Sequence, residues 1–263
     1  MSSAGAVFSD GEAYELVMGR WSRLVGESFL DWMDVPPGLR WADIGCGNGA
    51  FTELILARCV PSSLVGLDPS PGQIAHARSR PAAHQIDYQV ADGQALPLAD
   101  DGVDIAVMAL VIAFIPDPAK AVAELARITR PDGWIATYMW DFEAGGLPNR
   151  HIYLAAKSLG WSLAGPPTPD AAKQEVMRHL WQAAGLHSIE TETIRIRVSH
   201  PSFDRYWEIH SMPAGPAGTF IRSLSPDMRE RLQARLRETL PIAADGSITF
   251  EGIANAIKGR VPA

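Results

Sequence analysis

The sequence predicts an α/β fold with a doubly wound, mostly parallel sheet, and three observations support this prediction. Short apolar segments alternate with helical patterns over the first 140 residues, which is typical of strand–helix–strand crossover units. A glycine-rich loop directly follows the first apolar segment. The chain has 263 residues, of which 47% are hydrophobic and 20% charged, so it carries enough apolar mass for a sizeable core. We expect one domain spanning residues 1–263.

The spacing of apolar residues gives the order of elements in the first half of the chain. Five strands are expected, at residues 39–44, 63–67, 86–90, 103–109 and 134–140. Three helices are expected, at residues 48–57, 71–79 and 118–128. The turn Pro131-Asp132-Gly133 is expected to lead into the fifth strand.

The second half of the chain is less regular. Its pattern predicts helices at 171–184 and 225–240, and a shorter helix is compatible with residues 152–158. Alternation of apolar and polar residues predicts a long strand at 188–198 and a closing strand at 247–257. Ser225 followed by Pro226 is a typical helix start.

Composition and charge exclude several classes of protein. A formal net charge of -7 argues against a nucleic-acid partner. The longest apolar run, Ile105 to Ile115, is well short of the roughly 20 residues that a membrane-spanning helix needs. No signal peptide is visible, and the two cysteines do not make a disulfide framework. We therefore expect a cytoplasmic protein.

The loop after the first strand is the most informative stretch. Glycines at Gly45, Gly47 and Gly49 leave the backbone open to a ligand where a strand ends and a helix begins. A dinucleotide-binding fingerprint places its third glycine three residues after the second, whereas here the interval is two. Asp43 precedes the first glycine, and a carboxylate at this point suits an ammonium or sulfonium ligand better than a pyrophosphate.

The segment Asp43-Ile-Gly45-Cys46-Gly47-Asn48-Gly49 resembles the first motif of class I S-adenosylmethionine-dependent methyltransferases. Asp68 ends the second strand where this family holds the ribose hydroxyls, and Asp92-Gly93 resembles its adenine-binding element. The opening Met18-Gly19-Arg20-Trp21-Ser22 is similar to the ubiquinone/menaquinone-biosynthesis branch, whose members methylate small molecules. The resemblance implies a seven-stranded Rossmann-like sheet with a helical insertion that acts as a lid. For Asp68 the alternative is a helix cap before Ser70 and Pro71.

The resemblance also assigns functions to segments and residues. It implies lid helices at 8–36, a cofactor-binding core at 37–141, and acceptor-side segments at 142–185 and 199–245. The residues that it implies for S-adenosylmethionine are Tyr14, Arg20, Asp43, Gly45, Cys46, Gly47, Asn48, Gly49, Asp68, Pro69, Gln73, Asp92, Gly93 and Ala109. Arg20 is expected to pair with the carboxylate of the donor, and a surface salt bridge is the alternative.

Aromatic residues suggest the acceptor site. Phe114, Trp140 and Phe142 lie just past the carboxyl ends of the fourth and fifth strands, where open α/β sheets bind ligands. The other acceptor candidates are Met18, Trp21, Tyr206, Trp207 and His210. His210 is also the candidate general base, while core packing is the alternative for each large apolar residue. The seven histidines show no ligand spacing, so we expect no metal.

The resulting hypothesis is an enzyme that transfers a methyl group from S-adenosylmethionine to oxygen or carbon of a small, partly apolar molecule. The reaction would be an in-line displacement at the sulfonium methyl. Two alternatives remain open at this point: an NAD(P)-dependent oxidoreductase, and a protein that binds S-adenosylmethionine without chemistry.

Overall fold

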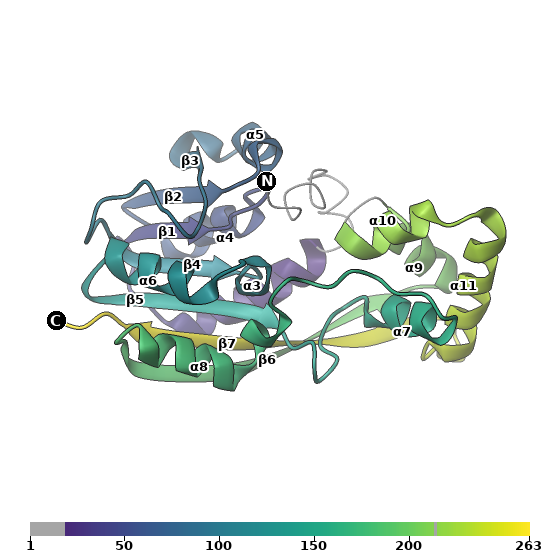
Figure 1. The fold of residues 1–263 in the computed structure, drawn as a ribbon. Coiled ribbons are helices and arrows are strands. Elements are labelled where there is room, and N and C mark those ends of the chain that lie inside the picture. Colours follow the sequence, from purple (N-terminus) through teal and green to yellow (C-terminus); the bar gives the residue numbers. More distant parts are fainter. Residues whose placement is uncertain (1–18, 213–214) are drawn as a thin grey trace.

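The computed structural model describes residues 19–212 and 215–263 (Figure 1). Seven strands form one mixed sheet with the order β3-β2-β1-β4-β5-β7-β6, and helices cover both faces. The fold class expected from the sequence is therefore confirmed.

The elements follow one another in a strand–helix alternation that gives way to helices after β5. The strands are β1 (Arg40–Ile44), β2 (Ser63–Asp68), β3 (Asp87–Val90), β4 (Val103–Ala109), β5 (Thr129–Trp140), β6 (His187–His200) and β7 (Ile248–Arg260). The helices are α3 (Arg20–Met33), α4 (Ala50–Cys59), α5 (Pro71–Ser79), α6 (Pro118–Ile128), α7 (Arg150–Ser158), α8 (Gln174–Ala183), α9 (Phe203–His210), α10 (Gly215–Ser223) and α11 (Pro226–Thr239). Short 3₁₀ helices lie at η2 (Ala83–Gln85), η3 (Ile112–Phe114) and η4 (Pro169–Ala172).

The order of the strands determines where a ligand can bind. Strands β1 to β5 pair in parallel, whereas β7 is antiparallel to both of its neighbours, β5 and β6. The chain moves from β1 to β2 and β3 on one side, and β4 then pairs with β1 on the other. The topological switch point therefore lies between the carboxyl ends of β1 and β4, and open α/β sheets bind ligands at such points.

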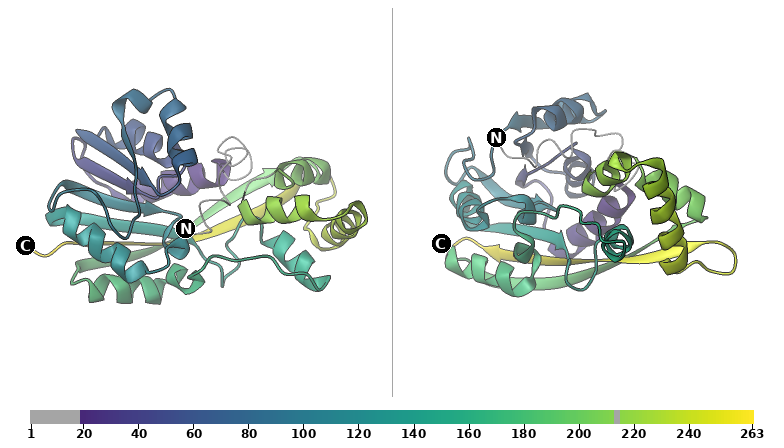
Figure 2. Two further views of the ribbon diagram at one scale, coloured as in Figure 1. Left: turned by 45° about the horizontal axis from the view of Figure 1, so that its top comes forward. Right: turned by 45° about the vertical axis from the view of Figure 1, so that its right-hand side comes forward.

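Two helical layers bury the sheet. Helices α3 and α4 pack together on one face, while α6 and α8 pack together on the other (Figure 2). The strands between them are apolar on both faces, as parallel sheets require, and Trp41, Ile105 and Val107 are fully buried. The sheet and its two layers thus form one continuous core.

Local chemistry explains why several helices begin where they do. The Ser70 hydroxyl accepts a hydrogen bond from the Gln73 amide, and the Asp117 carboxylate accepts one from the Lys120 amide. Ser225 caps α11 in the same way, as the sequence predicts. The helix expected at 48–57 begins instead at Ala50, because Gly49 has a φ of 83° and terminates the loop.

Three further differences from the expected elements concern β5, α8 and the helices after β6. Strand β5 begins at Thr129, so it includes the residues that were expected to form a turn. Helix α8 begins at Gln174, after the 3₁₀ turn η4. Helices α9 and α10 were not predicted, because both are short and α10 contains two glycines and a proline.

Strands β6 and β7 form a long antiparallel pair at one edge of the sheet, and helices α9, α10 and α11 lie between them in the sequence. They extend beyond the parallel strands toward α7, α9, α10 and α11 (Figure 1). This strand pair therefore holds these helices on the side of the sheet where the parallel strands end. Within residues 19–212 and 215–263, no helix has the length and apolar character needed to cross a membrane.

Candidate active site

A cavity of about 1280 Å³ lies at the carboxyl ends of the parallel strands. Most of the residues expected at the site line it: Asp43, Gly45, Cys46, Gly47, Asn48, Asp68, Pro69, Gln73, Asp92, Gly93, Ala109, Phe114, Trp140 and Phe142. The strand ends and loops therefore bring together residues that are up to a hundred positions apart in the sequence.

The glycine-rich loop presents its backbone to this cavity. Gly45 and Gly47 have φ angles of 75° and 53°, a conformation that glycine adopts without strain. The amides of Gly45 and Cys46 both donate to the Leu67 carbonyl oxygen, at 2.6 and 3.0 Å, and fix the loop to β2. Apart from its two chain neighbours, no described residue has a heavy atom within 4 Å of the position that a Cβ of Gly47 would take, so the backbone is open there.

Asp68 lies beside this loop at the end of β2. Its Oδ2 accepts a hydrogen bond from the Gly47 amide at 3.0 Å, and its Oδ1 accepts one from the Ser70 amide at 2.8 Å. Burial raises the pKa of Asp68, although both hydrogen bonds oppose this effect. Ser70, not Asp68, caps α5. A carboxylate has about four lone-pair sites, so Asp68 retains capacity toward the cavity.

Asp43 is the second carboxylate of this half of the cavity and is fully buried. Its Oδ2 accepts a hydrogen bond from the Thr52 hydroxyl at 2.7 Å, whereas its Oδ1 has no hydrogen-bond partner among the described residues. Burial raises the pKa of Asp43 to about 7; the Thr52 hydrogen bond opposes this shift, and the nearby charge of Asp68 adds to it. An unpartnered carboxylate oxygen at a cavity wall is suited to a cationic ligand.

The opposite half of the cavity is mainly apolar. Phe114, Trp140 and Phe142 contribute to its wall, as expected from their positions after β4 and β5. Helix α7 adds Tyr153 and Leu154, which the sequence analysis did not identify. The spacing of apolar residues in this helix was a signal that could have identified them. Helix α7 buries Ile152, Ala155 and Ala156, so its opposite face is free to line the cavity.

Four of the expected acceptor residues, Trp21, Tyr206, Trp207 and His210, lie outside the large cavity. Tyr206 and His210 are buried against His200 and Phe250, with ring centroids 4.4 Å apart between Tyr206 and His210, and do not line the large cavity. Burial, followed by the charges of His200 and His151, lowers the pKa of His210 to about 3. His210 therefore lies outside the large cavity and has a low pKa, and both properties differ from those expected of the general base.

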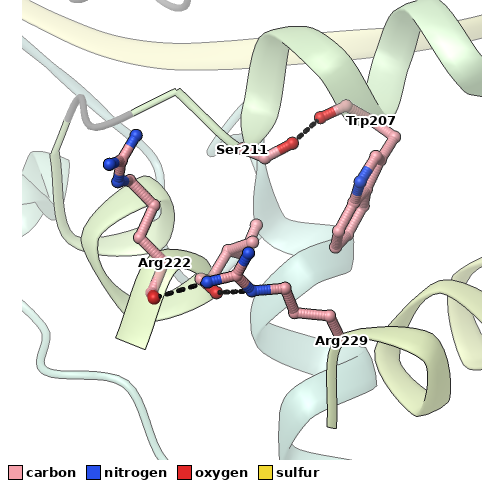
Figure 3. A pocket seen from close by; sticks show the side chains of 5 residues that line it. Trp207, Ser211, Arg222 and Arg229 are labelled. Atoms are coloured by element: carbon pink, nitrogen blue, oxygen red, sulfur yellow. Dashed lines mark hydrogen bonds between the residues drawn. The ribbon is translucent and has the colours of Figure 1, made fainter. Parts of the chain in front are cut away.

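Trp207 lines a separate cavity of about 320 Å³ between α9, α10 and the start of α11 (Figure 3). In this cavity the Arg229 guanidinium donates to the carbonyl oxygens of Ile221, at 3.1 Å, and Arg222, at 2.7 Å. The Ser211 hydroxyl donates to the Trp207 carbonyl oxygen. Arg229 therefore provides hydrogen-bond donors for the carbonyl groups at the C-terminal end of α10, which is a structural role.

The amino-terminal candidates also differ from the expectation. Trp21 is 1% exposed and packs near Gly252 of β7, and Arg20 is exposed and donates to the Ser199 carbonyl oxygen at 3.4 Å. Neither lines the cavity, whereas Ser22 does. Gly49 does not line the cavity either. It packs closely against Tyr88, because a Cβ at Gly49 would lie 2.5 Å from the Tyr88 hydroxyl oxygen.

Tyr14 and Met18 lie outside the described residues. No group of three or more histidine, cysteine, aspartate or glutamate side chains within the described ranges is arranged to hold a metal ion.

Known proteins similar to this chain include several methyltransferases. Residues 42–137 match a family model described as a methyltransferase domain. The malonyl-[acyl-carrier protein] O-methyltransferase of Serratia marcescens is 39% identical over 113 residues, which cover 43% of this chain and 43% of the relative. The enzyme of the same name from Methylococcus capsulatus is 35% identical over 186 residues, which cover 68% of this chain and 64% of the relative. The chain thus spans less than two thirds of the length of these curated relatives.

Solved structures similar in fold extend over more of the chain. A putative methyltransferase in complex with the Haloferax volcanii Trm112 methyltransferase activator has a TM-score of 0.63 and 20% identity, covering 100% of this chain and 99% of that one. Phosphoethanolamine N-methyltransferase 2 of Haemonchus contortus, solved with S-adenosyl-L-methionine, has a TM-score of 0.58 and 18% identity, covering 95% of this chain and 56% of that one. Residues 42–137 thus match a methyltransferase domain, and the sheet order and the glycine-rich loop agree with the class I S-adenosylmethionine-dependent methyltransferases that the sequence resembles.

Proposed function

We propose that this protein transfers a methyl group from S-adenosylmethionine to oxygen or carbon of a small, partly apolar acceptor. The observation that carries the proposal is one cavity with two unlike halves. Asp43, Asp68 and the open glycine-rich loop form one half, and the aromatic residues after β4 and β5 form the other. This arrangement brings a cationic donor and an apolar acceptor together.

The residues of the donor half fit S-adenosylmethionine. The unpartnered Oδ1 of Asp43 offers a negative partner for a cationic group, and Asp68 offers acceptor positions for vicinal hydroxyls. The backbone at Gly47 leaves room for close approach. When bound, this cofactor supplies an activated methyl group that an acceptor atom attacks in line.

The contribution of the chain is to orient the acceptor and exclude water. We assign residues 37–141 to cofactor binding and residues 142–185 to the acceptor side, with 8–36 and 199–245 as covering segments. Holding two reactants in near-attack geometry contributes ~7–11 kcal/mol to lowering a barrier. The apolar walls support this role because they hold the acceptor without competing hydrogen bonds to water. The names of the curated relatives favour oxygen as the attacked atom.

Ligand-induced stabilisation tests the choice of cofactor. S-adenosylmethionine and S-adenosylhomocysteine are expected to raise the melting temperature, because a ligand that binds only the native state stabilises it by mass action. NAD and NADP are expected to leave it unchanged. The reverse pattern would support the oxidoreductase alternative. Turnover of labelled donor with a panel of phenols and carboxylic acids then separates an enzyme from a protein that only binds the donor.

Asp68→Ala is expected to weaken S-adenosylmethionine binding roughly 10- to 100-fold, because it removes charge-assisted hydrogen bonds of about 1.5–3 kcal/mol. Titration calorimetry measures this effect. Asp87→Ala, an exposed carboxylate on the neighbouring strand, is the control and should bind the donor normally. Equal affinities of the two variants would contradict the role of Asp68.

The pKa of Asp43 predicts a pH dependence of donor binding. Because that pKa is about 7, the carboxylate is ionised at pH 8 and mostly protonated at pH 5.5. A cationic donor favours the ionised form, so its dissociation constant is expected to rise roughly tenfold between pH 8 and pH 5.5. In Asp43→Asn this dependence should be nearly absent. If the variant and the native protein show the same pH profile, Asp43 does not contribute the titrating charge.

A further inference from the structure

The charges that line the large cavity are unevenly distributed. Three carboxylates, Asp43, Asp68 and Asp92, lie in the donor half. Arg150, the first residue of α7, is the only cationic side chain among the described residues that line the cavity. Glu143 also lines it, but the Lys173 ammonium lies 3.6 Å from its Oε2 and offsets its charge.

Arg150 has no carboxylate partner among the described residues. Its Nη1 donates to the Gly145 carbonyl oxygen at 3.0 Å, a contact that fixes the side chain at the cavity wall without neutralising it. A guanidinium has five N–H donors in a planar fork, and this single bond leaves most of them for a ligand.

A second and independent observation concerns the residue before it. Asn149 is 8% exposed, lines the cavity and is the N-cap of the nine-residue helix α7. Asparagine at this position normally caps its helix, but here no side-chain cap hydrogen bond forms, and its Oδ1 is buried without a partner. This oxygen is an acceptor and cannot itself bind an anion, whereas the Nδ2 of the same amide is a donor and makes no hydrogen bond among the described residues.

The remaining wall near α7 is apolar. Leu154 lines the cavity although it is 56% exposed, and Tyr153 lies beside it. A large aliphatic side chain at this exposure contributes little to the core and is available to contact a ligand. The surface around Arg150 thus combines one unneutralised cation, one unsatisfied amide and an apolar face.

We propose that the acceptor carries an anionic group, a carboxylate or phosphate, that binds to Arg150 and Asn149 at the N-terminus of α7. Its apolar body lies along Tyr153 and Leu154. The positive end of the helix dipole adds to the attraction, and the Nδ2 of the Asn149 amide is the donor available to the anion. This inference rests on the proposed function, because it assigns the substrate class of the same cavity.

Three phenols that share one ring test the inference: 4-hydroxyphenylacetate, 4-hydroxybenzylphosphonate and the neutral 4-hydroxyphenylacetamide. Titration calorimetry is performed in saturating S-adenosylhomocysteine. In the native protein at least one of the two anionic probes is expected to bind tenfold or more tightly than the neutral amide. Which anionic probe binds more tightly shows whether the site prefers a carboxylate or a phosphate-like group. Arg150→Gln should abolish the preference, whereas Arg150→Lys should retain part of it.

Lys157→Gln is the matched control, because Lys157 lies on the same helix but is exposed and outside the cavity lining. It should retain the full preference, and every variant should keep its native affinity for S-adenosylhomocysteine. Equal binding of all three probes to the native protein would overturn the inference and leave the proposed function intact. A loss of S-adenosylhomocysteine affinity in Arg150→Gln would instead assign Arg150 to the donor. Failure of the native protein to bind S-adenosylhomocysteine would refute the proposed function itself.

Discussion

Gly146→Ala is expected to lower the free energy of unfolding by about 3–5 kcal/mol, in the range of the most damaging single substitutions. A Cβ at this position would lie 2.1 Å from the carbonyl oxygen of Ile253 in β7, which is a backbone atom. The backbone cannot easily move away. The Gly146 amide donates to the Asp141 carbonyl oxygen at 2.6 Å, and the Ile253 amide donates to the Gly146 carbonyl oxygen at 3.1 Å.

Urea unfolding at pH 8 measures this loss. Gly72→Ala is the control, because Gly72 lies in the first turn of α5. Apart from its chain neighbours and the backbone of its own helix, the nearest described atom to a Cβ there would be the Ser70 hydroxyl oxygen, at 3.9 Å. Alanine in place of glycine at such a helical position should raise stability by about 0.5–1 kcal/mol. A loss below about 1 kcal/mol in Gly146→Ala would show that the loop after β5 adjusts freely, contrary to its hydrogen bonding.

Lowering the pH from 8 to 5 is expected to remove about 4 kcal/mol of stability through two buried histidines, about 2 kcal/mol each. Burial lowers the pKa of His200 to about 4 and that of His210 to about 3. In the unfolded chain a histidine has its ordinary pKa near 6.5 and takes up a proton in this range. The unfolded state therefore binds more protons than the native state, and stability is lost as the pH falls below about 6.5.

Asp43 acts in the opposite direction, because its raised pKa makes the native state bind the extra proton over much of the same range. The measurement is therefore a difference between the native protein and His210→Phe, in urea unfolding at pH 8, 6 and 5. The variant should lose about 2 kcal/mol less than the native protein between pH 8 and pH 5. Parallel stability curves for the two proteins would contradict the burial of a neutral His210.

The sequence was sufficient to predict that Asp43, Asp68 and the glycine-rich loop lie together at one cavity, because the determinants of their positions are local. Gly45 and Gly47 adopt positive φ angles within one loop, and Asp68 follows β2 directly. The parallel sheet then brings these strand ends together by its topology. Each of these residues could be placed from a short stretch of sequence and the rules of strand order.

The apolar half of the cavity depends on packing between distant segments, and the sequence was a poor guide to its lining residues. Tyr206 and His210 have the residue types of an acceptor pocket, but they pack on His200 of β6 and Phe250 of β7. Trp21 is likewise buried near β7. An aromatic side chain has the same pattern in the sequence whether it faces a ligand or the core.

The position of β7 has a consequence for how the chain is assembled during synthesis. β7 lies between β5 and β6 in the sheet, yet it follows every other strand in the sequence. Until residues 248–260 have left the ribosome, β5 and β6 each have an edge with unpaired amide and carbonyl groups. A nascent chain that stalls before this point therefore exposes two unpaired strand edges that can pair with other chains. We expect this interval, and not the formation of β1 to β4, to be when the protein most needs a chaperone.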